Sequence, residues 1–139
     1  MLKITDADAD RAISFKHTGR TAGGIELFDK IIINIPNDGD YFITWTITHN
    51  TSSLQNDGAL SGSAITTYLK VNGESKLAQT AIRNCTPNLP NQRDDKFYDH
   101  SLSGQAILSL PANAKLTLNY KETYYGVLTH RVINIIKLS

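Results

Sequence analysis

Residues 37–50, NDGDYFITWTITHN, contain the pattern that most constrains the fold. Large apolar side chains stand at every second position from Tyr41 to Ile47, and threonines alternate with them from Thr44 to Thr48. One side of an extended chain would therefore carry Tyr41, Ile43, Trp45 and Ile47. Because successive side chains of a strand point to opposite faces, the alternation predicts a β-strand with one buried face. The preceding PNDGD at 36–40 predicts a turn, since Asn, Asp and Gly tolerate positive φ.

The rest of the chain has the same period of two. No segment has a convincing helical period, and Asn72-Gly73 is a strong hairpin signal. Turn residues recur at intervals of about ten residues, which is typical of an antiparallel sandwich or barrel. There is no internal repeat or linker, so we expect one domain, 1–139. The further predicted strands are 12–16, 24–28, 30–35, 104–110, 114–125 and 129–139, and residues 64–82 are predicted to form a hairpin around Asn72-Gly73.

Composition excludes several function classes. The net charge is only +1 and the Lys and Arg residues are scattered, so the sequence has no basic cluster that would bind nucleic acid or an anionic membrane surface. No apolar run approaches the roughly 18 residues that span a bilayer, so no membrane insertion is expected. The start of the chain has no apolar h-region, and we expect no signal peptide. The single cysteine, Cys85, precludes an internal disulfide and has no signature of a reactive thiol around it.

The last predicted strand, RVINIIKLS, is apolar on both faces. Val132, Ile136 and Leu138 point one way, and Ile133 and Ile135 point the other. Apolar residues on both faces indicate burial on both faces. One face fits the core of the domain, and another subunit is a good candidate to cover the other. Outward-facing apolar residues of two other strands join this set, so the predicted interface contains Phe42, Tyr68, Val132, Ile136 and Leu138.

Several segments together resemble one known family. The run from Gly39 to Trp45, GDYFITW, resembles the Gly-x-Tyr-x-Phe-x-aromatic core of complement globular-head domains. YLKVNG (68–73) and SGQAILSLPANAKLTL (103–118) resemble later strands of that family, and the closing INIIKLS resembles its bacterial members. Four positions differ from the family pattern. Ile33 and Ile43 replace phenylalanines, and Asn113-Ala114 replaces a Gly-Asp turn.

The resemblance implies a ten-stranded antiparallel jelly-roll sandwich, shared with tumour-necrosis-factor-like cytokines and assembled as a homotrimer. It implies a family-like core at 25–139, preceded by an N-terminal strand and lead-in at 1–24, with the last strand near the three-fold axis. Bacterial and phage members stand at the tips of collagen-like stalks or fibres. It therefore implies a place on the extracellular surface, on a spore, a cell or a virion fibre, although no Gly-X-Y repeat is present in this chain.

Two loops hold candidate ligand-binding residues. RDDKFYDH gathers three aspartates and a histidine, which fit either a charged surface loop or a metal or ligand site. A tyrosine pair at a strand end fits either packing or sugar stacking. These candidates are Asp94, Asp95, Asp99, His100, Tyr124 and Tyr125. No cofactor is expected, but calcium stays open at these carboxylates. The N-terminal Asp6, Asp8 and Asp10 resemble the start of a calcium loop without its later glycine and glutamate.

Catalytic motifs are missing. The four histidines show no zinc spacing, Gly-x-Ser-x-Gly is absent, and there is no glycine-rich phosphate loop. We therefore predict a non-catalytic trimeric head domain that drives self-association and displays loops for adhesion or ligand binding. The alternative is a lectin-like carbohydrate-binding module. A cytokine-like ligand of a surface receptor is a third hypothesis.

Overall fold

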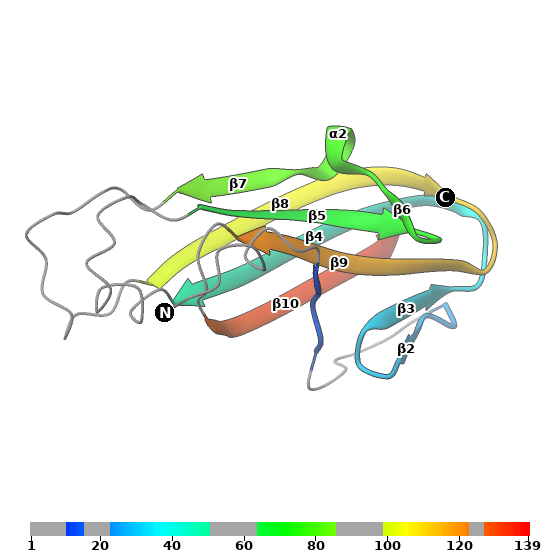
Figure 1. Cartoon of the computed structure of the whole chain (residues 1–139). Helices are drawn as coiled ribbons and strands as arrows, with labels where there is room; N and C mark the ends of the chain where they lie inside the picture. The colour runs from blue at the N-terminus through cyan, green and yellow to red at the C-terminus, as the bar shows by residue number, and fades with distance from the viewer. Residues whose placement is uncertain (1–10, 16–22, 51–63, 86–98, 123–126) are drawn as a thin grey trace, which may run out of the picture.

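The structure is a computed structural model, and it describes residues 11–15, 23–50, 64–85, 99–122 and 127–139. This part of the chain is all-β apart from one helical turn (Figure 1). Its elements are β1 (Arg11–Ala12), β2 (Glu26–Phe28), β3 (Ile32–Ile35), β4 (Gly39–Asn50), β5 (Ala64–Val71), β6 (Glu74–Ser75), α2 (Leu77–Thr80), β7 (Ile82–Cys85), β8 (Asp99–Leu110), β9 (Ala114–Glu122) and β10 (Val127–Lys137).

The strands form two antiparallel sheets that pack face to face. The larger sheet has the order β2-β3-β9-β5-β6, with β1 added to β9 and β7 added to β5. The smaller sheet has the order β10-β4-β8, and Figure 1 shows these long strands running together behind β5 and β9. Most neighbours in the sheets are distant in the sequence, as in a jelly roll. The predicted all-β antiparallel fold is confirmed.

The strand predicted from alternation is β4, the central strand of the smaller sheet. Tyr41, Ile43, Trp45 and Ile47 are each no more than 2% exposed. They meet inward-facing residues of β5 and β9, among them Leu69 and Leu116, in one apolar core between the sheets. The threonines between them point to the outer face of the smaller sheet. The period of two thus positions both the core and the exposed face discussed below.

A tryptophan and a glycine share the centre of this core. Trp45 on β4 lies opposite Gly104 on β8, and a Cβ atom on Gly104 would be 2.3 Å from the indole ring. The indole Nε1 donates a hydrogen bond to Thr67 Oγ1 of the other sheet at 2.9 Å. Because a buried N–H requires an acceptor, Thr67 occupies an inward position that apolar residues otherwise fill. The glycine provides the space that the ring occupies.

Two tight turns have consecutive residues with positive φ, the pattern of type I′ hairpins. Asn72-Gly73, at 53° and 81°, joins β5 to β6 as the sequence predicts. Asp29-Lys30, at 51° and 63°, joins β2 to β3. The sequence analysis placed Lys30 in a strand, because Asp-Lys is not a residue pair that signals this turn.

The N-terminal strand contributes to the same core. Ile13 N–H donates to Leu118 O at 2.7 Å, and Phe15 N–H donates to Lys30 O at 2.7 Å. Ile13 and Phe15 are 1% and 5% exposed. The described part of the lead-in therefore packs against the strands of the larger sheet.

Candidate self-association face

The outer face of the smaller sheet has one fully apolar row. The strand register pairs Ile136 of β10 with Phe42 of β4, and Phe42 with Ile107 of β8. Ile136 is 56% exposed and Ile107 is 65% exposed, with the half-buried Phe42 between them. Leu138 lies one row further, held by its N–H donating to Asp40 O at 2.7 Å, and is 54% exposed. We call these four residues, Phe42, Ile107, Ile136 and Leu138, the apolar row.

The face becomes polar away from the apolar row. The next row consists of Asn134, Thr44 and Gln105. Beyond it, Thr46 Oγ1 and Ser103 Oγ are hydrogen-bonded at 3.1 Å, and Thr48 Oγ1 and Ser101 Oγ are paired at 3.4 Å. In each pair the two hydroxyl groups are hydrogen-bonded to each other across the strands, and such polar side chains are compatible with exposure to water. The apolar row is therefore a local feature at one end of the sheet.

The final strand divides as its sequence indicates. Ile133 and Ile135 pack against the core, while Val132, Ile136 and Leu138 are exposed at 36%, 56% and 54%. Three exposed large apolar side chains on one strand are unusual for a strand that faces only water. Ile136 and Leu138 belong to the apolar row, whereas Val132 lies opposite Thr46, two rows away from Ile136 on the same face.

Tyr68, also predicted at the interface, lies elsewhere. It belongs to β5 of the larger sheet and is 1% exposed. Lys121 Nζ lies 5.9 Å from the centre of its ring. A side chain that is already buried in the single chain has no surface to bring to an interface, so Tyr68 is not part of the face described here.

Ile107 was missed by the sequence analysis although its signal was present. In GQAILSL, the inward residues are Ala106, Leu108 and Leu110, so the period of two places Ile107 on the outside. Its cross-strand position next to Phe42 depends on the register, which the sequence alone does not provide.

The predicted ligand-binding residues lie at or beyond the limits of the described chain. Asp94, Asp95, Tyr124 and Tyr125 lie outside the described residues, as do Asp6, Asp8 and Asp10. Asp99 and His100 begin β8, where their backbones pair with Asn50 and His49 of β4. Among the residues that the structure describes, no group of three His, Cys, Asp or Glu side chains lies close enough together to hold a metal ion.

The turn before β4 is anchored by Tyr41. Its hydroxyl donates to Asn37 O at 2.6 Å. Burial of the ring, followed by the nearby negative charge of Asp38, raises the pKa of Tyr41 above its ordinary value of 10.0. The same end of the strand is held by Ser109 Oγ, which donates to Asp40 Oδ1 across the sheet. These contacts fix the end of the sheet that carries the apolar row.

Comparison with known proteins shows which solved structures have a similar fold. No family model matches the chain, and no curated protein matches its sequence. In the described residues, no helix is long and apolar enough to cross a membrane. Among solved structures, murine APRIL at pH 8.5 is similar with a TM-score of 0.58 and 12% identity, covering 96% of this chain and 89% of that chain. Murine APRIL at pH 5.0 has the same TM-score and identity, covering 93% and 88%. The likeness shows that the chain has the jelly-roll fold of tumour-necrosis-factor-like proteins.

Proposed function

We propose that this chain is a non-catalytic domain that assembles into a homotrimer through the outer face of its smaller sheet. The observation that carries the proposal is the apolar row, in which Ile136, Phe42 and Ile107 are aligned across three strands. An exposed, contiguous apolar surface on a sheet favours association with another protein surface. A second copy of the same chain is the partner that the likeness to trimer-forming jelly rolls supports.

The direction of the contact follows from symmetry. In a cyclic trimer each subunit uses two different surfaces, one toward each neighbour. The smaller sheet offers two such surfaces, because Ile136 and Leu138 lie at its β10 side and Ile107 lies at its β8 side. A head-to-tail arrangement covers both sides in all three copies.

The finer assignment is a head domain on an extracellular surface, on a spore, a cell or a virion fibre, which displays its loops for adhesion or ligand binding. Asp94, Asp95, Tyr124 and Tyr125 are the loop residues that we would test first for a glycan or a receptor. A lectin-like module would rest on the same tyrosines, so a glycan array with Tyr125→Ala is the experiment that separates binding from assembly alone.

The experiment for assembly is light scattering on a sizing column. We expect a mass of three times the chain mass of 15.3 kDa. Ile136→Asp would bury an unpaired carboxylate at each interface, at a cost of about 3 kcal/mol or more, which is roughly a 100-fold weaker association. Because Ile136 is 56% exposed in the single chain, its fold should survive the change.

A matched control tests whether the effect belongs to the face. Phe28 on β2 is also exposed, at 46%, but it belongs to the larger sheet. Phe28→Asp should leave the trimer intact. A wild-type chain that elutes as a monomer at all concentrations, or an Ile136→Asp variant that stays trimeric, would refute the proposal.

A further inference from the structure

A groove lies between β8 and a wall formed by the β5–β6 hairpin and α2. Its volume is about 480 Å³, within the range of about 300–1,000 Å³ that is typical of small-molecule sites. Residues 107–111, at the end of β8 and just beyond it, form one side. The hairpin wall contains Val71, Asn72, Glu74, Lys76 and Gln79. Because half of the lining residues are polar, the groove suits a ligand that forms hydrogen bonds.

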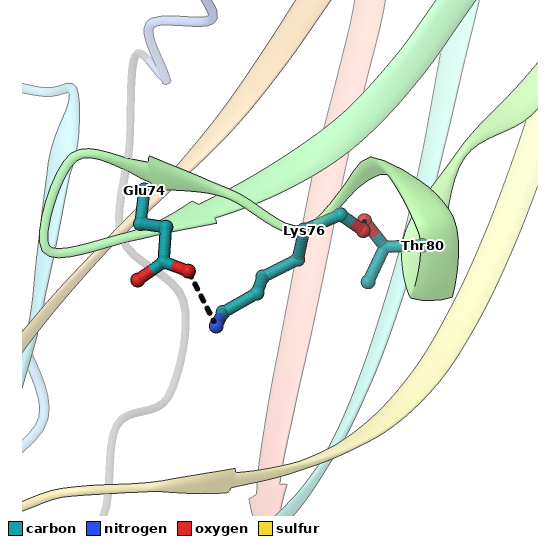
Figure 2. A network of polar contacts seen from close by, with 3 residues as sticks. All are labelled: Glu74, Lys76 and Thr80. Carbon is teal, nitrogen blue, oxygen red and sulfur yellow. Dashed lines mark hydrogen bonds and ion pairs between the residues drawn. The ribbon is translucent and has the colours of Figure 1, made fainter.

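Glu74 and Lys76 form a charged pair in the hairpin wall. Figure 2 shows their side chains on the same side of the hairpin, with Lys76 Nζ 3.6 Å from Glu74 Oε1. An N–H···O hydrogen bond is shorter, at about 2.7–3.2 Å, so the two groups are not closely bonded to each other. A ligand hydroxyl can donate to a carboxylate and accept from an ammonium group at the same time. The pair therefore provides an acceptor and a donor for one hydroxyl.

The charges of this pair also restrict the class of ligand. An anionic ligand would be repelled by Glu74, and a cationic ligand would be repelled by Lys76. The two side chains are 77% and 31% exposed, and an exposed ion pair contributes little to stability. A neutral ligand with hydroxyl groups can therefore replace the contact between the two charges at low cost.

Three further side chains supply hydrogen-bonding groups. Asn72 Oδ1 accepts Lys115 N–H at 2.9 Å, which leaves the side-chain NH₂ of Asn72 to donate. Ser109 Oγ donates to Asp40 Oδ1, which leaves the lone pairs of Ser109 Oγ to accept. The exposed carboxamide of Gln79 can do both. Since each hydroxyl of a sugar is both a donor and an acceptor, this mixture of groups matches a sugar.

The β8 side of the groove adds apolar contact. Ile107 is 65% exposed, and Pro111 is also exposed. One face of a pyranose ring presents C–H groups, which can pack against such side chains while hydroxyls at the ring edge form hydrogen bonds. Apolar contact combined with a few placed polar groups is the usual composition of a small-molecule site.

The hairpin wall is held rigidly. Thr80 Oγ1 accepts a hydrogen bond from Leu69 N–H at 2.9 Å and donates one to Lys76 O at 2.8 Å. Lys76 N–H donates to Leu69 O at 2.9 Å. At the turn, Asn72 N–H donates to Lys115 O at 2.8 Å. A wall that is fixed before binding loses little conformational entropy when a ligand binds.

We propose that this groove binds a neutral sugar ring, with one hydroxyl between Glu74 and Lys76 and a further hydrogen bond to Gln79. The proposal goes beyond self-association and does not depend on it, since Ile107 is the one lining residue that belongs to the apolar row. It also differs from a lectin-like site at the predicted tyrosine pair, which lies outside the described residues.

NMR titration of the isotope-labelled chain tests the groove. The probes are the methyl pyranosides of glucose, galactose, mannose and N-acetylglucosamine, added to millimolar concentration. We expect at least one probe to shift the side-chain amide signals of Asn72 and Gln79 and the backbone amide signals of 107–110. Glu74→Ala and Gln79→Ala should each weaken its binding by about 10-fold, the effect of one lost hydrogen bond. Both residues are exposed, so the fold should survive either change.

The matched control variant is Gln105→Ala. Gln105 carries the same carboxamide as Gln79 and is exposed on β8, but it is not among the lining residues. Its replacement should leave binding unchanged. Glucosamine and glucuronate serve as charged probes, and each should bind more weakly than the neutral sugars, since the first meets Lys76 and the second meets Glu74.

The proposal is wrong if no probe shifts the groove signals, or if Gln105→Ala weakens binding as much as Gln79→Ala. Tighter binding of a charged probe than of every neutral one would also overturn it. A response that is lost in Tyr125→Ala but kept in Gln79→Ala would place the sugar elsewhere and overturn it as well. The mass in solution is a separate readout, because a monomer that binds sugar in the groove would refute the proposed trimer and leave this inference standing.

Discussion

Gly104→Ala tests the description of the core most directly. The added Cβ would lie 2.3 Å from Cε2 and Cζ2 of Trp45 and 2.7 Å from its Nε1. The ring has nowhere to move, because it is 1% exposed and its Nε1 is bonded to Thr67. Overpacking a rigid core costs about 1–3 kcal/mol. Loss of the buried indole hydrogen bond adds about 1–3 kcal/mol. We expect a total of roughly 2–6 kcal/mol, enough to remove much of the stability of a small domain.

The assay is urea denaturation followed by fluorescence. The chain has a single tryptophan, so the signal reports on the site of the substitution itself. If the chain is trimeric, wild type and variant are compared at one protein concentration. The slope of the unfolding curve should stay constant while the midpoint falls. A free energy of unfolding within about 0.5 kcal/mol of wild type would refute the packing argument, because that is the range of a neutral surface change.

Two controls separate the possible causes. Gly73→Ala adds a Cβ with no atom within 4 Å but at φ +81°, so it should cost only the left-handed backbone strain of about 1–2 kcal/mol. In a Trp45→Phe background, followed by circular dichroism, Gly104→Ala should cost much less than in the native protein. A double-mutant cycle without coupling would mean that the ring is not the obstacle.

Three further predictions concern α2 and the two turns that precede β3 and β4. Thr80→Val should lower the free energy of unfolding by about 1–3 kcal/mol, since it leaves Leu69 N–H without an acceptor; Thr80→Ser, which keeps the hydroxyl, should restore most of it in the same urea titration. Lys30→Gly should raise thermal stability by about 0.5–1 kcal/mol, because glycine relieves a left-handed lysine at φ 63°; an unchanged melting curve would argue against the type I′ turn. The raised pKa of Tyr41 means that the folded chain holds this proton more tightly than the unfolded chain, so its contribution is present below pH 10 and is lost as pH rises through the raised pKa. Denaturation of wild type and Tyr41→Phe between pH 8 and 11 should show the steeper loss in wild type, and parallel curves would count against it.

The sequence predicts most of the fold because alternation is a direct record of which side chains face the core. It identifies β4, the Asn72-Gly73 hairpin and the two-sided last strand. It does not identify α2, because a four-residue helix has no period to detect and depends on the hydroxyl of Thr80. Alternation also divides a strand into two faces without saying which are covered, and for this reason Tyr68 was expected at a surface that the fold buries.

The candidate face was predictable only in part. Phe42, Ile136 and Leu138 are visible in the sequence as apolar residues on the outer sides of their strands. Their alignment with Ile107 is a property of register, which arises from turns and loops far apart in the chain.

The hydrogen bond between Trp45 and Thr67 has a consequence for how the two layers are aligned. Contacts between aliphatic side chains are tolerant of small translations, so two sheets held by them alone can slide over one another at little cost. A directional bond between the layers, buried where water cannot replace it, selects one alignment and penalises the others. Thr67→Val would then produce a loosened sandwich with several interconverting alignments, visible as broadened NMR signals from residues of both sheets. In a symmetric assembly every copy must share one alignment, so this single bond would help to keep the subunits identical.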